Sequence, residues 1–531
     1  MDDKLREEIN RRRTFAIISH PDAGKTTLTE KFLLFGGAIN TAGSVKGKAN
    51  SKYAVSDWMD IEKERGISVT SSVLQFNYGG YCINILDTPG HQDFSEDTYR
   101  TLMAADSAVM VIDASKGVEA QTIKLFKVCV MRHIPIFTFI NKMDRDARDT
   151  FELLDDIETV LGIKTCPVNW PIGSGKEFKG VYDRKTQVVS TFQAISTGGA
   201  KKAAETDYHI EDEGLKKLVG PYLYDQFKEE IELVDGATDE MDIEKVRAGE
   251  LSPVFFGSAL NTFGIEQFLN YFLQMTTPPI GRNSSEGIID PVTEPFSAFV
   301  FKIQANMNKA HRDRIAFMRI CSGKFEAGME VYHAASKRKI KLSQPQQLMA
   351  QDRKIVEEAY AGDVIGVFDP DLFSIGDTLT AGGKKFEYEG IPTFAPEHFC
   401  RVVQLNSMKR KQFVKGVTQI AQEGAIQIFQ EYTAGLSEII VGVVGVLQFD
   451  VLKYRLENEY GCEIRLEPIP YNYIRWVKDP TTDVTKLKRV SDVKKVKDMK
   501  GNPLLLFANE WVIDQVLQHN EGLELEEFRK N

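Results

Sequence analysis

The chain has 531 residues, of which 42% are hydrophobic, and a formal net charge of −10 at pH 7. This length predicts two to four domains, and the acidic balance argues against a generic nucleic-acid coat. No apolar run approaches the ~18 residues of a membrane span. The six cysteines lack paired spacing. We therefore expect a cytoplasmic protein with no membrane contact and no cysteine metal site.

The first predicted strand leads into a phosphate-binding loop. Residues 14–19 form an apolar, β-branched run typical of a buried strand, and we expect a helix at 27–35. Strand, loop and helix are the context of a P-loop, whose backbone N–H groups hold phosphates. Lys25 would reach the β- and γ-phosphate oxygens, and the Thr26 hydroxyl would ligate Mg²⁺. The predicted nucleotide-binding residues here are Ser19, which replaces the first glycine of the motif, His20, Pro21, Asp22, Ala23, Gly24, Lys25, Thr26 and Thr27.

A second strand, predicted at 81–86, ends in a turn that suits a phosphate sensor. Asp87 follows at the carboxyl end of the strand, where open α/β sheets place ligands, and an Asp there can hold Mg²⁺ through water. Gly90 can offer its N–H to the γ-phosphate because no side chain blocks the approach. The predicted binding residues of this turn are Asp87, Thr88, Pro89 and Gly90. The alternative is a plain turn, which Pro and Gly form easily.

His91 follows this turn and is the candidate catalytic residue. It would position the attacking water, the role that Gln has in Ras-type enzymes. The alternative is an exposed loop histidine. We expect in-line attack on the γ-phosphate, with Lys25 and Mg²⁺ stabilising the developing charge. No arginine finger is identifiable, so slow intrinsic turnover is expected.

A third strand, predicted at 136–140, is followed by a base-recognition motif, and the predicted binding residues are Asn141, Lys142, Met143 and Asp144. Asp144 can accept from both the ring N–H and the exocyclic amine of guanine. Adenine would leave this carboxylate unpaired, which is costly in a buried site. A loop after the short strand at 254–256, Ser258-Ala259-Leu260, could give a backbone N–H to the guanine oxygen. The expected ligands are therefore GTP or GDP and Mg²⁺.

The remaining pattern predicts three domains. An α/β P-loop GTPase domain at 1–280 carries an insertion near 170–249, and a small β-barrel domain follows at 292–385. An α+β domain at 386–531 contains a βαββαβ order typical of a ferredoxin-like unit. Its tail after 471 remains unassigned.

Three basic segments are candidates for RNA contact: Lys409-Arg410-Lys411 with Lys415, Lys337-Arg338-Lys339, and the run at 486–500. Charge runs are more often simply solvated, and this alternative stays open.

These motifs resemble the translational GTPases. Asp57-Trp58-Met59, followed by Glu64-Arg65-Gly66-Ile67-Ser68, is similar to their switch I. By that likeness Ser68, where many relatives carry Thr, would ligate Mg²⁺, and Ile67 would form an apolar gate beside His91. Stretches at 87–100, 301–313 and 442–450 resemble more closely the bacterial peptide chain release factor 3 family.

The resemblance to release factor 3 implies a function in translation termination. The GTP form would act on the ribosome after peptide release and drive off the codon-reading release factor. The implied partners are the ribosome, through rRNA and ribosomal proteins, and the codon-reading release factors, with the chain itself a monomer. The alternatives are another translational GTPase, such as a translocation or rescue factor, and a guanine-nucleotide-sensing module with little turnover.

Overall fold

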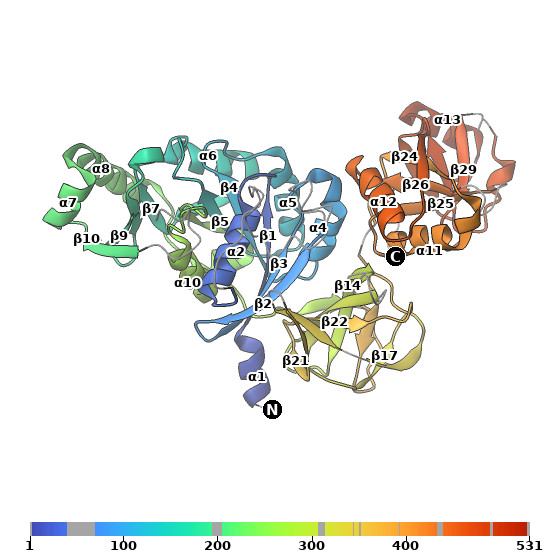
Figure 1. Cartoon of the computed structure of the whole chain (residues 1–531), viewed down its shortest axis with the longest axis horizontal. Helices are drawn as coiled ribbons and strands as arrows, with labels where there is room; N and C mark the ends of the chain where they lie inside the picture. Colours follow the sequence, from blue (N-terminus) through green and yellow to red (C-terminus); the bar gives the residue numbers. More distant parts are fainter. Residues whose placement is uncertain are drawn as a thin grey trace.

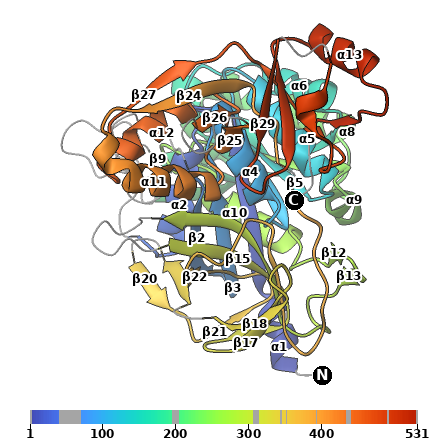
Figure 2. The same ribbon diagram turned by 90° about the vertical axis from the view of Figure 1, so that its right-hand side faces the viewer.

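The structure is a computed structural model that describes residues 3–39, 70–193, 204–305, 314–342, 345–349, 352–391, 393–432, 439–488 and 492–527. An α/β unit is followed by a β-barrel and then by an α+β domain (Figure 1). Figure 2 views the molecule onto the α+β domain, with the barrel below it and the α/β unit behind. No helix in these ranges has the length and apolar character needed to cross a bilayer.

The α/β unit is built on a seven-stranded sheet with the order β2-β3-β1-β4-β5-β11-β6. Its strands are β1 (Arg12–Ser19), β2 (Ser72–Tyr78), β3 (Tyr81–Asp87), β4 (Ser107–Asp113), β5 (Ile136–Asn141), β6 (Lys164–Pro167) and β11 (Leu251–Phe256). β1 runs parallel to β3 and β4, whereas β2 is antiparallel to β3. The four predicted strands are confirmed, and each is longer than expected.

Helices cover both faces of this sheet. They are α2 (Lys25–Phe35), α4 (Ser95–Leu102), α5 (Ala120–Met131), α6 (Thr150–Leu161) and α10 (Ile265–Met275). The first helix, α1 (Asp3–Asn10), packs against the barrel, and its Ile9 belongs to the barrel core. Successive β1 side chains point to opposite faces. Phe15 packs with Phe32 of α2 and Phe272 of α10, whereas Ala16 belongs to the core under α4, α5 and α6. This alternation produces the doubly wound unit that was predicted.

Between α6 and β11 the chain forms a second, antiparallel sheet with the order β10-β9-β8-β7. Its elements are β7 (Asn169–Ile172), β8 (Gly180–Asp183), β9 (Val188–Gln193), β10 (Ala204–His209), α7 (Glu213–Val219), α8 (Pro221–Ala237) and α9 (Ile243–Ala248). α7 and α8 stand at the end of the molecule far from the barrel (Figure 1).

Between the α/β unit and the barrel, the segment at 276–291 contains a short hairpin of β12 (Arg282–Ser284) and β13 (Gly287–Ile289). Gly287 has φ +98°, which a glycine adopts without steric cost, and this allows the tight turn. Three-residue strands leave too little periodicity for a sequence pattern to reveal them.

The barrel contains an eight-stranded sheet with the order β18-β17-β23-β14-β15-β22-β19-β20, and a small β16-β21 pair. Its strands are β14 (Ser297–Ala305), β15 (Arg314–Ser322), β16 (Lys324–Glu326), β17 (Glu330–His333), β18 (Arg338–Lys341), β19 (Gln346–Met349), β20 (Asp352–Ile355), β21 (Glu358–Tyr360), β22 (Val364–Phe368) and β23 (Thr378–Thr380).

The last domain begins with the predicted βαββαβ order. Its elements are β24 (His398–Gln404), α11 (Arg410–Gln422), β25 (Gln427–Glu431), β26 (Ile439–Val443), α12 (Leu447–Asn458) and β27 (Ile464–Pro468). Their strand order, β27-β24-β26-β25, is that of a ferredoxin-like unit.

The unassigned tail continues the same sheet to eight strands through the order β25-β29-β30-β28-β31. The tail elements are β28 (Tyr473–Val477), β29 (Val493–Lys497), β30 (Pro503–Phe507), α13 (Glu510–His519) and β31 (Leu525–Glu526).

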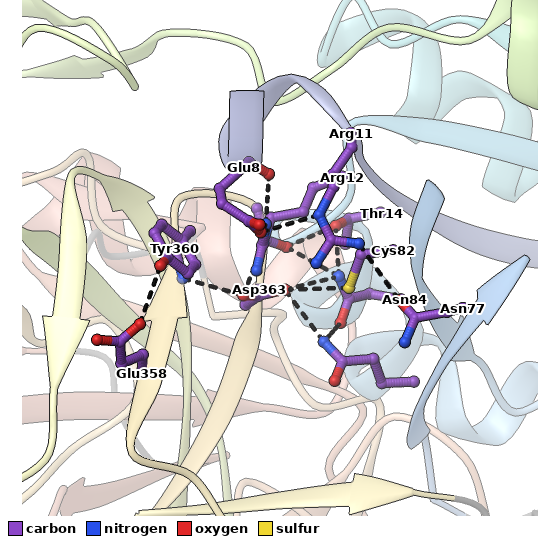
Figure 3. Close-up of polar contacts among 12 residues, drawn as sticks. Glu8, Arg11, Arg12, Thr14, Asn77, Cys82, Asn84, Glu358, Tyr360 and Asp363 are labelled. Atoms are coloured by element: carbon purple, nitrogen blue, oxygen red, sulfur yellow. Dashed lines mark hydrogen bonds and ion pairs between the residues drawn. The ribbon is translucent and has the colours of Figure 1, made fainter. Parts of the chain in front are cut away.

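A buried polar cluster joins the α/β unit to the barrel (Figure 3). The carboxylate of Asp363 accepts hydrogen bonds from Arg12 Nε at 2.7 Å, Gln75 Nε2 at 3.1 Å and Asn84 Nδ2 at 3.3 Å. It also accepts from the backbone N–H of Tyr360 at 2.9 Å. Burial lowers the pKa of Arg12, but Asp363 and the nearby Glu8 outweigh it and hold that pKa above its usual value. The guanidinium therefore stays charged inside the joint.

Candidate functional site

The P-loop and the phosphate-sensing turn lie at the same edge of the sheet. β1 ends at Ser19 and β3 ends at Asp87, and the two strands pair with Ile17 opposite Asp87. Because parallel neighbours end at one edge, their loops meet there. Lys25 Nζ lies 2.5 Å from Asp87 Oδ1, and both side chains are almost fully buried.

Local bonds set the shape of both loops. Gly24 precedes α2 with φ +101°, so α2 begins at Lys25, two residues earlier than predicted. The Thr88 hydroxyl donates to the Ile17 carbonyl at 2.7 Å, which ties the turn to β1. A Cβ built on Gly90 would lie 3.5 Å from Pro21 Cα. The turn therefore packs directly against the P-loop.

The predicted base-recognition loops also meet the P-loop. Asn141 Nδ2 donates to the Ala23 carbonyl at 2.8 Å, and its Oδ1 accepts from the Ala259 N–H at 2.8 Å. Asp144 Oδ1 accepts from the Ser258 hydroxyl at 2.5 Å. A single amide thus holds together three loops that are far apart in the sequence.

Lys142 spans the site toward the P-loop. Its Nζ donates to the Asp22 carbonyl at 2.5 Å and lies 2.6 Å from Asp113 Oδ2. Met143 is buried at 1% exposure, and its N–H donates to the Gly257 carbonyl at 3.2 Å. These contacts fix the backbone on both sides of the Lys142 side chain.

Thr26 and Asp87 offer a hydroxyl and a carboxylate, the oxygen ligands that Mg²⁺ prefers. Asp87 and Lys25 form a buried pair, and each would require a charged partner if the pair separated. A phosphate and a divalent cation would supply those partners, so the residues fit the ion. Ser68, the third predicted Mg²⁺ ligand, lies outside the described residues, as does the rest of the stretch that resembles switch I.

His91 lies at the start of a short 3₁₀ turn, η1 (Gln92–Phe94). Its Nδ1 accepts from the Asp93 N–H at 3.2 Å and lies 3.3 Å from Asp93 Oδ1. The ring packs edge-on against Phe94, with centroids 6.2 Å apart. Within the described part of the chain, its polar contacts are with Asp93 and not with Lys25 or Asp87.

Two aspartates of this region were not predicted from the sequence as site residues. Asp113 ends β4 at the same sheet edge as Asp87, so the rule that selected Asp87 applies to it as well. Lys142 and Ser115 hold the pKa of Asp113 below its usual value, although burial alone would raise it. No local pattern indicates Asp93, because the group that donates to its Oδ2, the N–H of Leu447, is distant in sequence.

The predicted basic segments are partly neutralised within the fold. Lys409 Nζ donates to the Gly461 carbonyl at 2.6 Å. Lys494 lies 2.7 Å from Glu431, and Lys339 lies 3.3 Å from Glu330. The two ion pairs offset part of the positive charge of these segments, whereas the Gly461 carbonyl leaves the charge of Lys409 in place. Contact with RNA stays a prediction.

Three protein families match the chain in succession. They are Elongation factor Tu GTP binding domain at residues 10–278, Elongation factor G domain 2 at 295–382, and Class II release factor RF3, C-terminal domain, at 388–517. A crystal structure of a protein from Thermus thermophilus shares the fold with a TM-score of 0.69. It is 22% identical and covers 92% of this chain and 72% of that one.

Two relatives match the chain over almost its full length, and both have the same name. Peptide chain release factor 3 of Symbiobacterium thermophilum is 57% identical over 521 residues, which cover 98% of each chain. Peptide chain release factor 3 of a Cyanothece species is 53% identical over 522 residues, 98% of this chain and 96% of its own. Since the matching families also follow one another in this order, the chain belongs to the peptide chain release factor 3 family, a family of translation termination GTPases.

Proposed function

We propose that the chain hydrolyses GTP to GDP and phosphate when the ribosome stimulates it. In its GTP form it promotes the dissociation of codon-reading release factors after peptide release. One observation carries the nucleotide assignment: Asn141 joins the P-loop to the loop at Ala259, beside the pair of Lys25 and Asp87. Membership of the family supports the termination role. The proposed partners are the ribosome and the codon-reading release factors, and the proposed state is a cytoplasmic monomer.

The proposed mechanism assigns one task to each group. Lys25 leaves Asp87 and binds the β- and γ-phosphate oxygens, while N–H groups at the start of α2 hold the phosphates. Thr26, Asp87 and Ser68 would hold Mg²⁺, which would neutralise charge at the phosphates when bound. His91 positions the attacking water.

Guanine selectivity is assigned to Asp144. Its Oδ1 accepts from Ser258, which orients the carboxylate so that its remaining lone pairs can accept from the two guanine donors. Adenine offers no such donor pair at that edge. ATP should therefore bind far more weakly than GTP.

The function is tested with ribosomes that carry a bound codon-reading release factor after peptide release. Adding the chain with GTP should speed departure of a fluorescent release factor, and GDP or ATP should not replace GTP. Hydrolysis is measured in parallel with and without ribosomes. GTP turnover without faster departure would reject the termination role and keep the GTPase. Equal use of ATP would reject the nucleotide assignment.

A further inference from the structure

The C-terminal domain contacts the α/β unit directly behind His91. The N–H of Leu447, the first residue of α12, donates to Asp93 Oδ2 at 2.7 Å. Asp93 is 6% exposed, so this bond is shielded from water. A carboxylate at a helix N-terminus is also favoured by the helix dipole.

The backbone at Gly445 lies in very close contact with Asp93. A Cβ built on Gly445 would overlap the Asp93 side chain and lie 2.5 Å from its Cα. Gly445 has no positive φ, so its backbone tolerates any residue and only the contact requires glycine. The glycine is therefore required by the interface between the domains rather than by the fold of its own domain.

A second contact comes from α4. Arg100 donates to the carbonyls of Glu423 and Gly424 at 3.1 and 2.7 Å. This contact joins the same two domains, but Arg100 has no bond to His91. The interface thus includes a contact next to His91 and a contact that is separate from it.

The two oxygens of Asp93 face different domains. Oδ2 is held by Leu447, while Oδ1 lies 3.3 Å from His91 Nδ1. The Asp93 N–H donates to the same ring nitrogen at 3.2 Å. The ring nitrogen accepts from the Asp93 N–H, so the ring is held by the backbone of η1. Leu447 holds the carboxylate of the same residue, so the position of α12 influences where this backbone lies and thereby how the His91 ring is oriented.

We infer that Asp93 is a positioning residue for His91 and that the docked C-terminal domain sets it in place. This inference rests on the proposed role of His91 in hydrolysis. Hydrolysis then requires that α12 and η1 be in contact when the ring turns toward the phosphate. Loss of the contact should slow the chemical step without weakening nucleotide binding, because Asp93 touches neither the P-loop nor the base loops.

Three variants test the inference with ribosomes at saturation. Asp93→Ala removes the carboxylate that contacts Leu447 and His91 but keeps the backbone N–H that donates to His91, and Gly445→Ala pushes α12 away while Asp93 remains. Asp93→Asn keeps an oxygen acceptor for Leu447 and places an amide N–H, which can donate to His91 Nδ1, where the second carboxylate oxygen lies. Gly236→Ala is the matched control, since a Cβ there meets nothing within 4 Å and its φ is not positive. The measurements are the single-turnover hydrolysis rate and the Kd for GTP.

Asp93→Ala and Gly445→Ala should each lower the single-turnover rate by roughly 10-fold or more, the scale at which small misplacements of a reacting group act. The Kd for GTP should stay within about 2-fold of wild type, and Asp93→Asn should recover most of the rate, because neither change reaches the nucleotide loops. An unchanged rate in Gly445→Ala, or losses confined to Kd, would overturn the inference. Wild-type protein that does not hydrolyse GTP with ribosomes would instead reject the proposed function.

Discussion

Gly24 and Asn141 lie in such close contact that any side chain at position 24 would overlap the Asn141 amide. That amide holds the P-loop to the base loops through Ala23 and Ala259. Gly24→Ala should therefore displace Asn141 and abolish measurable GTP binding in a fluorescent-nucleotide titration. A variant with wild-type affinity would show that the contact is not needed.

Gly37→Ala separates this effect from backbone strain. Gly37 also has a positive φ, +69°, but a Cβ there meets nothing within 4 Å. The variant should lose about 1 kcal/mol of stability from the left-handed backbone and keep its affinity for GTP. A matching loss of binding in both variants would assign the effect to strain alone.

Asp144→Asn tests base selection. The amide keeps an acceptor for Ser258 but loses the charge that would accept from two guanine donors. A hydrogen bond to a charged group contributes about 1.5–3 kcal/mol, so the Kd for GTP should rise by about 10-fold or more. Competition by ATP and GTP against a fluorescent guanine nucleotide measures the remaining preference. Undiminished preference for GTP would exclude Asp144 as the selecting residue.

His91→Ala should largely abolish ribosome-stimulated GTP hydrolysis and leave the Kd for GTP unchanged. The reason is that the ring contacts η1 rather than the P-loop. His209→Ala, at an exposed position on β10, is the control and should behave as wild type in both assays. Phosphate release measured with and without ribosomes gives the comparison. Normal stimulated turnover in His91→Ala would remove this residue from the mechanism.

Asp363→Ala should lower the free energy of unfolding by about 3 kcal/mol, because it leaves the buried Arg12 without its main carboxylate partner. The control is Glu524→Ala, which breaks an ion pair with Lys478. Both of those side chains are more than half exposed, so the expected loss is at most about 1 kcal/mol. Urea unfolding followed by tryptophan fluorescence measures both. Equal losses would contradict the view that burial gives the Asp363 cluster its strength.

Lys31 predicts a pH dependence of stability. Burial lowers the pKa of Lys31 from 10.5 to about 8, opposed by Glu30. Between these values the unfolded chain binds more protons than the folded chain, so the contribution of Lys31 to the free energy of unfolding rises with pH. Lys31→Met should therefore stabilise the protein most below pH 8, and the gain should shrink as the pH approaches 10. A gain that is constant from pH 7 to pH 10 would contradict this sign.

Much of the fold could be predicted because its signals are local. The buried run of β1 and the turn after Asp87 carry their patterns within a few residues. β1 nevertheless begins earlier than predicted, at Arg12, because the charge of this residue is matched by Asp363, 351 positions away. No local pattern could reveal that pairing. The hydrogen bond between Leu447 and Asp93 could not be predicted for the same reason.

The tail after residue 471 pairs with the outer strand of the ferredoxin-like unit. β25 is the outer strand of that unit, and β29 pairs with it through Gln430 opposite Lys497 and Glu431 opposite Val496. Without the tail, β25 would present unpaired N–H and C=O groups, and such open edges recruit strands from other molecules. The appended strands therefore close the edge at β25 and move the end of the sheet to β31, a strand of two residues that offers another strand little backbone to pair with.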